Sequence, residues 1–184
     1  MSSNSPEWFK IDDSYNDVER EFLRTMLARA QTWVTMGLSP ADVWLLDVER
    51  PLILCVDICD PETKGALRTL RVDFDGVSVI VGEDETGQMS TDLDITHPDV
   101  LFRHDVEGTP NFFATIAADW IEQELRRPIE RHEWSGTYFR HRRWVLADTH
   151  TPLVWSDSSN EPHPELGEPH RIVVVRDFRK LDKV

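Results

Sequence analysis

The densest group of side chains with potential chemistry is a basic stretch in the last third of the chain. Residues 126–143 hold six arginines and two acidic residues, a net charge of +4. Guanidinium groups bind phosphate and carboxylate, and a tryptophan on the same strand face can stack against them. This stretch indicates a small-anion site, or an enzyme site with histidine as base and arginine as oxyanion holder. Its candidate residues are Arg131, His132, Arg140, His141 and Arg143.

The same arginines have an alternative use as internal partners for acidic side chains. Residues 1–107 carry 22 acidic and 9 basic residues (−13), whereas residues 108–184 carry 12 and 11 (−1). A positive stretch in such surroundings is expected to form intramolecular ion pairs. No spacing in it demands a catalytic arrangement, so we expect no catalytic residues and favour a role other than catalysis.

Acidic side chains form the second candidate site. Residues 42–107 hold 16 acidic and 5 basic residues, a net charge of −11. Strand alternation would spread many of these carboxylates over one exposed sheet face, where they would attract a basic protein or peptide. Trp155 opens onto a polar loop and could serve as an exposed anchor. The candidate binding residues are Asp57, Asp73, Asp75, Asp92, Asp94 and Trp155.

Several other classes of protein are excluded or disfavoured. The sequence contains two D-x-D pairs, Asp73/Asp75 and Asp92/Asp94, and neither continues into a metal-binding motif. No histidine or cysteine spacing is typical of a metal site. No phosphate-binding glycine loop or nucleophile elbow occurs, so we expect no cofactor and no metal. The negative field disfavours nucleic acid and anionic membrane, and no apolar run could cross a bilayer. Cys55 and Cys59 are too far apart on one strand for a disulfide, which predicts reduced thiols and a cytoplasmic protein.

The elements that must position these side chains follow from apolar periodicity. The pattern predicts amphipathic helices over 17–36 and from 109 to about 127. Short apolar runs separated by turn residues predict an antiparallel meander, with a hairpin at Asp75-Gly76, and a second group of strands near the C-terminus. The predicted strands cover 43–48, 52–58, 67–74, 77–81, 91–95, 129–134, 139–147, 153–156 and 171–178.

Strands and helices are segregated, so the predicted fold class is α+β, with an antiparallel sheet packed against two main helices. Residues 1–13 are predicted to be a flexible arm and 14–184 a single domain. The order helix, meander, helix, strands is loosely similar to small bacterial chaperones that hold secreted effectors and to immunity proteins that cap toxins. The favoured function is a non-enzymatic acidic protein that binds a basic protein partner; the arginine–histidine stretch is the alternative. A homodimer joining the arginines of one copy to the acidic strands of another is a third possibility.

Overall fold

The structure of the chain, a computed structural model, describes residues 8–46, 51–84, 92–136, 140–157 and 167–179, apart from the side chains of 155–157. The chain divides into two compact units. Unit 1 comprises Met1–Cys59 and Arg68–Glu124, and unit 2 comprises Asp60–Leu67 and Leu125–Val184. Helices and antiparallel sheets are segregated as predicted, so the α+β class is confirmed. The single domain over 14–184 stays a prediction, because compactness does not show whether a unit folds alone.

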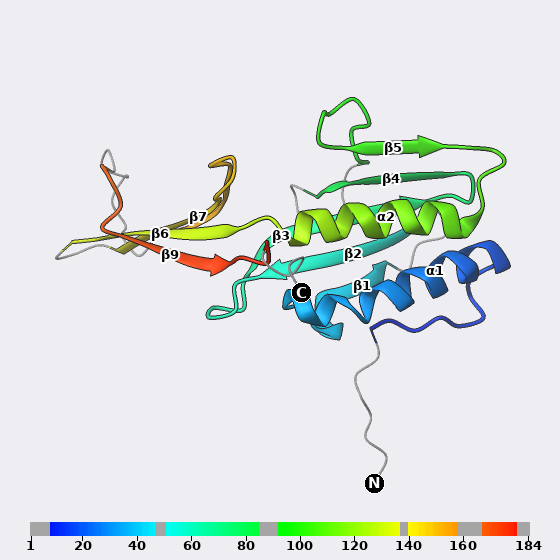
Figure 1. Cartoon of the computed structure of the whole chain (residues 1–184), viewed down its shortest axis with the longest axis horizontal. Coiled ribbons are helices and arrows are strands. Elements are labelled where there is room, and N and C mark those ends of the chain that lie inside the picture. The colour runs from blue at the N-terminus through cyan, green and yellow to red at the C-terminus, as the bar shows by residue number, and fades with distance from the viewer. Residues whose placement is uncertain (1–7, 47–50, 85–91, 137–139, 158–166, 180–184) are drawn as a thin grey trace, which may run out of the picture. The chain divides into compact units, whose positions relative to one another are not determined.

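Unit 1 is built on a five-stranded sheet with the strand order β1-β2-β3-β4-β5 (Figure 1). The pairs β1–β2, β3–β4 and β4–β5 are antiparallel. The predicted hairpin forms, and Gly76, at a φ of 102°, lies in its turn. Three residues separate β3 from β4, one more than the predicted Asp75-Gly76 turn. The strands are β1 (Val43–Leu46), β2 (Leu52–Cys59), β3 (Ala66–Phe74), β4 (Ser78–Glu83) and β5 (Leu101–His104).

The first helix, α1 (Asp17–Ala30), begins at a reciprocal cap. The Asn16 side chain accepts a hydrogen bond from the Glu19 amide at 3.0 Å, and the Glu19 carboxylate accepts one from the Asn16 amide at 2.8 Å. The helix ends six residues before the predicted boundary, and a 3-10 turn over Trp33–Met36 follows it. Gly37, at a φ of 76°, terminates that turn.

The predicted N-terminal arm is anchored where the structure describes it. Trp8 is buried, and its ring packs edge to face on Trp33 with 6.3 Å between centroids. Residues 1–7 of the arm lie outside the described residues. A flexible arm therefore remains a prediction for those residues only.

The second helix, α2 (Pro110–Leu125), begins after a Thr109 cap, as predicted. The Thr109 hydroxyl accepts a hydrogen bond from the Phe112 amide at 3.2 Å, and proline occupies the first helical position, where no amide hydrogen is needed. Alanines at three of the buried positions let the helix approach the sheet closely. The buried residues are Phe113, Ala114, Ala117, Ala118, Ile121 and Leu125.

Three phenylalanines join both helices to the same face of the sheet. The Phe22 ring of α1 stacks on Phe74 of β3 at 4.2 Å, and Phe113 of α2 lies against Phe74 at 5.9 Å. All three rings are at most 1% exposed. Both helices therefore cover one face of the sheet, as Figure 1 shows, and the opposite face is left for other side chains.

Unit 2 holds a four-stranded antiparallel sheet with the order β8-β7-β6-β9. Arg131 of β6 lies opposite Trp144 of β7 and Val173 of β9. The predicted C-terminal strands thus form a sheet of their own and do not extend the meander. The strands are β6 (Ile129–Ser135), β7 (Arg140–Leu146), β8 (Pro152–Asp157) and β9 (Arg171–Arg176).

One strand lies in a different place from the prediction. The predicted strand 91–95 is absent from residues 92–95, and residue 91 lies outside the described residues. Instead β5 occupies Leu101–His104, where no strand is predicted. Leu93 packs over Gly82, which accounts for an apolar residue outside a strand. The β5 strand has little local signal because it depends on backbone pairing with β4.

The helices give no sign of a membrane span. In the described ranges, none combines the length and apolar character that crossing a bilayer requires.

We predict that Cys55 resists thiol reagents in the folded protein. Cys55 is fully buried, and burial raises the pKa of its thiol to about 12, so the reactive thiolate is scarce near neutral pH. A folded Cys59→Ser variant should react very slowly with dithionitrobenzoate and release one equivalent of chromophore after unfolding in guanidinium chloride. The matched Cys55→Ala variant keeps the half-buried Cys59 and should react faster. Equal rates for the two folded variants would contradict the prediction.

Candidate functional site

Two of the predicted binding acids, Asp57 and Asp73, are engaged within unit 1. The Asp57 carboxylate accepts hydrogen bonds from the Trp44 indole at 3.0 Å and the Thr69 hydroxyl at 2.7 Å. Asp73 is 5% exposed and binds the Arg71 guanidinium through both oxygens, at 2.6 and 2.7 Å. These side chains belong to the sheet face opposite the helices, and their charges are satisfied inside the unit.

Burial governs the ionisation of the Arg71–Asp73 pair. It raises the pKa of Asp73, and the Arg71 guanidinium opposes this without cancelling it. Burial also lowers the pKa of Arg71, but the hydrogen bond and charge of Asp73 outweigh it, so the pKa of Arg71 is raised overall. The pair thus presents little net charge to a partner in solution.

The other three acids, Asp75, Asp92 and Asp94, are exposed. Asp75 accepts a hydrogen bond from the Ser78 amide at 2.7 Å, and Asp94 accepts one from the Thr96 amide at 2.9 Å. Hydrogen bonds from Thr96 lower the pKa of Asp94, which keeps its carboxyl ionised. The exposed acids therefore lie in turns and loops at the ends of strands, and not along one strand face.

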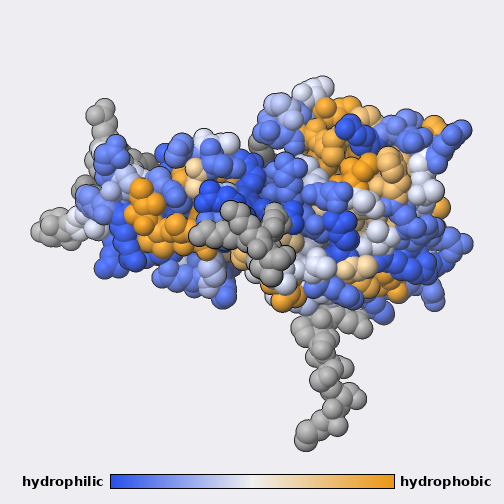
Figure 2. All heavy atoms as spheres, in the orientation of Figure 1, coloured by the Kyte–Doolittle hydropathy of each residue, from blue (hydrophilic) through white to orange (hydrophobic). Residues whose placement is uncertain are grey.

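Sequence reasoning missed a further acidic group on and beside β5, the edge strand of the sheet. Asp99, Asp105 and Glu107 are exposed there, close in sequence to Phe102 at 38% and Val106 at 76% exposure. Figure 2 shows hydrophobic residues between hydrophilic ones over the β5 and α2 part of unit 1. The sequence carries this signal, since residues 92–107 hold five acidic residues and one arginine among apolar residues.

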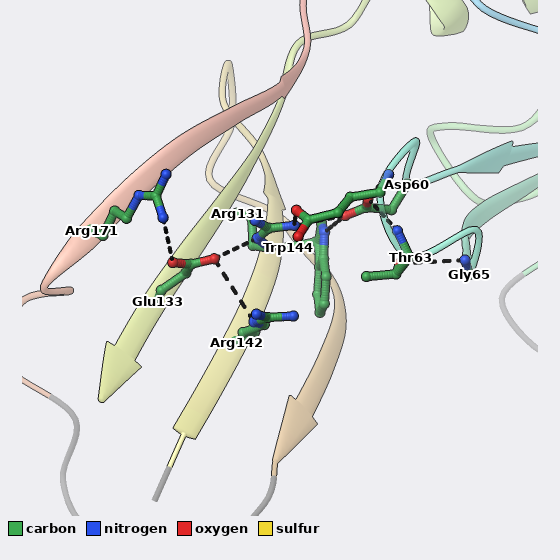
Figure 3. A network of polar contacts seen from close by, with 9 residues as sticks. Asp60, Thr63, Gly65, Arg131, Glu133, Arg142, Trp144 and Arg171 are labelled. Carbon is green, nitrogen blue, oxygen red and sulfur yellow. Dashed lines mark hydrogen bonds and ion pairs between the residues drawn. The ribbon is translucent and has the colours of Figure 1, made fainter. Parts of the chain in front are cut away.

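Unit 2 contains a buried polar network centred on Asp60 (Figure 3). One Asp60 oxygen accepts hydrogen bonds from the amides of Glu62 at 2.7 Å and Thr63 at 3.0 Å. The other oxygen accepts from the Trp144 indole at 2.6 Å and from Arg131 at 3.4 Å. Burial alone would raise the pKa of Asp60, but these donors and the Arg131 charge outweigh it, so the pKa is lowered. The network ties the turn before β3 to the unit 2 sheet.

Glu133 continues this network across three strands of unit 2. Its carboxylate lies 2.8 Å from Arg131, 3.6 Å from Arg171 of β9 and 3.8 Å from Arg142 of β7 (Figure 3). Arg131 also contacts Glu62 at 2.7 Å, and its side chain is 5% exposed. Arg131 is therefore surrounded by carboxylates of its own unit. Two of them, Asp60 and Glu62, belong to residues 1–107, the acidic part of the chain with which the arginine stretch is expected to pair, whereas Glu133 lies within the stretch itself.

The residues of the predicted anion site fall on both faces of the unit 2 sheet. One face carries Arg131 and Arg140, and the other carries His132, His141 and Arg143. His141 is 6% exposed, and its ring lies 5.3 Å from that of Trp134. The structure therefore does not gather the five side chains around one ligand.

Two further expectations concern Trp155 and metal binding. Trp155 lies in β8 opposite Arg143, but its side chain is outside the described part of the chain, so its role as an anchor stays a prediction. In the ranges that the structure describes, no group of three or more histidine, cysteine, aspartate or glutamate side chains is arranged to hold a metal ion.

Comparison with protein-family models, with curated proteins and with solved structures finds no match to this chain.

We predict that Asp60→Ala destabilises the protein by about 3 kcal/mol, because it leaves the buried Trp144 indole and two turn amides without their acceptor. Glu62→Ala is the matched control: its side chain is 65% exposed, and its loss should cost less than about 1 kcal/mol. Guanidinium denaturation followed by circular dichroism measures both. Equal costs would contradict a central role for Asp60.

The lowered pKa of Asp60 also sets a pH dependence. Its stabilisation is present above the ordinary pKa of 3.8 and is lost as the pH falls through the lower pKa of the folded state. Below about pH 4, the free energy of unfolding should therefore fall less steeply with falling pH for an Asp60→Asn variant than for the native chain.

Proposed function

We propose that this protein is a non-enzymatic binding protein that engages a basic protein partner through the carboxylates of unit 1. The asymmetry of charge between the units supports this proposal. Unit 1 has 8 basic and 23 acidic residues, a net charge of −15, whereas unit 2 has 12 and 11, a net charge of +1. A field of one sign on one unit favours a partner of the opposite sign.

The observation that carries the proposal is the surplus of carboxylates on the unit 1 surface. Among its described residues, ten acidic side chains are exposed against three basic ones, Lys10, Arg24 and Arg103. Arg68 and Arg71 are buried in ion pairs and compensate internal acids. The exposed acids are Asp12, Asp13, Asp17, Asp75, Asp92, Asp94, Asp99, Asp105, Glu107 and Asp119.

Such a surface acts mainly on the rate of encounter. Complementary charge accelerates association with a cationic protein, and salt screens the effect because the Debye length shrinks. Binding by exposed carboxylates should therefore weaken steeply as ionic strength rises. A cytoplasmic role of the immunity or chaperone kind is part of the same proposal, supported by the two thiols and the order of the elements.

Self-association is a second form of the same idea. The arginines of unit 2 in one copy would meet the unit 1 carboxylates of another, giving a homodimer. Light scattering at low and high salt separates this form from a heterologous complex, because only a homodimer changes the mass of the isolated protein.

We predict that immobilised protein retains basic proteins at about 50 mM salt and releases them at about 500 mM, where screening is strong. A variant with Asp94→Asn, Asp99→Asn, Asp105→Asn and Glu107→Gln should lose most of this retention. The amides keep an acceptor oxygen for the local turns, so the loss reports on charge. Retained proteins are identified by mass spectrometry and ranked by isoelectric point.

The matched control removes charge of the opposite sign. Arg24→Gln with Arg103→Gln makes unit 1 more negative and should strengthen retention of the same proteins. Retention of acidic proteins, or retention that ignores salt, would show the proposal to be wrong.

A further inference from the structure

Three segments of unit 1 meet at one end of the sheet. The start of α1, the β3–β4 turn and the β5–α2 turn lie together there, on the right in Figure 1. The Asp105 amide donates to the Val77 carbonyl at 3.0 Å, and Val18 Cγ1 lies 3.8 Å from where a Cβ on Gly76 would stand. We call this the end surface and define it as residues 17–20, 75–77 and 105–112.

The end surface exposes an unusual share of apolar side chains. Among the described residues of unit 1, seven large hydrophobic side chains are exposed, and four of them are here. Exposed apolar residues that gather in one place mark an interaction site more often than single ones do. They are Val18 at 41%, Val77 at 41%, Phe112 at 46% and Val106 at 76% exposure.

The same residues carry a negative charge. The end surface holds five acidic residues and one basic residue, Arg20, a net charge of −4. Arg20, the basic residue of the end surface, forms an ion pair with Asp17 at 2.7 Å. Among the described residues, the other four acids form no ion pair with a basic residue of this surface. The remaining acids are Glu19, Asp75, Asp105 and Glu107.

The end surface is attached to the core of unit 1 by packing contacts. The stacked rings of Phe22 and Phe74 and the tilted ring of Phe113 join α1, β3 and α2, the elements next to its three segments. A Cβ on Gly108 would stand 2.8 Å from the Phe113 ring, so the β5–α2 turn rests against the core. A surface that is ordered before binding loses little conformational entropy when a partner docks.

We propose that the end surface docks a cationic protein segment that also carries apolar side chains. This inference rests on the proposed function and adds where the partner binds and what it must present. The apolar residues of the segment cover Val18, Val77, Val106 and Phe112, and its lysines or arginines lie against the surrounding carboxylates. Charge complementarity selects a cationic segment, and the exposed apolar area requires that it be amphipathic.

The test uses labelled peptides of about 15 residues, roughly four turns if helical, and fluorescence anisotropy with the full chain. One peptide combines lysine and leucine, a second replaces every leucine by serine, and a third replaces every lysine by glutamate. We expect the lysine–leucine peptide to bind most tightly. Val106→Ser with Phe112→Ser should weaken its binding by about fivefold or more, as loss of central apolar contacts does.

Two controls keep this test specific. Val34→Ser removes an apolar side chain that is 58% exposed outside the end surface and should change binding less than about twofold. Val106→Ser alone avoids Phe112, whose ring lies 5.4 Å from buried Phe113, and a smaller loss of binding is expected from it. Thermal unfolding confirms that each variant is folded.

The remaining outcomes would contradict the proposed function, the docking site or both. If no cationic peptide binds the native chain, the proposed function and this inference both fail. If the lysine–leucine peptide binds but the double variant binds it equally, or if the serine peptide binds as tightly, the docking site is wrong while the proposed function stands. Self-association that Val106→Ser abolishes would make the end surface a contact between copies and overturn the inference.

Discussion

The packing of Phe22, Phe74 and Phe113 is the contact on which unit 1 depends. One ring comes from each of α1, β3 and α2, so a single aromatic cluster fixes both helices on the sheet. Offset and tilted rings contribute beyond their buried area, and truncation of such a residue typically costs several kcal/mol. Since these segments also form the end surface, the same contact that stabilises the core determines the arrangement of the surface above it.

The acidic residues of unit 1 have two different roles that composition does not separate. Asp57 and Asp73 satisfy polar groups on the sheet, whereas Asp105 and Glu107 face solvent. In unit 2 one carboxylate, Glu133, lies within 4 Å of three arginines, Arg131, Arg142 and Arg171. Net charge therefore overstates the field of a protein when its ion pairs are internal, and exposure decides which charges a partner meets.

Local signals predicted most of the fold, and contacts distant in sequence supplied the rest. The caps at Asn16 and Thr109 and the apolar periodicity placed the two helices, and short apolar runs placed most strands. Alternation also predicted that Arg140 and His141 face opposite sides of a strand. It could not show that Leu93 and Val100 would lie over Gly82 on the face of Asp73. Nor could it show that Arg131 would meet an acceptor 71 residues earlier in the chain. Pairing and burial of this kind are properties of the assembled sheet.

Two side chains of the β4–β5 connection, Leu93 and Val100, pack over Gly82 of β4. A Cβ atom there would lie 2.9 Å from a Val100 methyl group and 3.3 Å from a Leu93 methyl group, so these two side chains occupy the space that a side chain on β4 would need. An alanine there would require the Val100 and Leu93 side chains to shift. The missing methyl group thus leaves room on this strand for two apolar side chains of the connection, although Gly82 carries neither charge nor chemistry of its own.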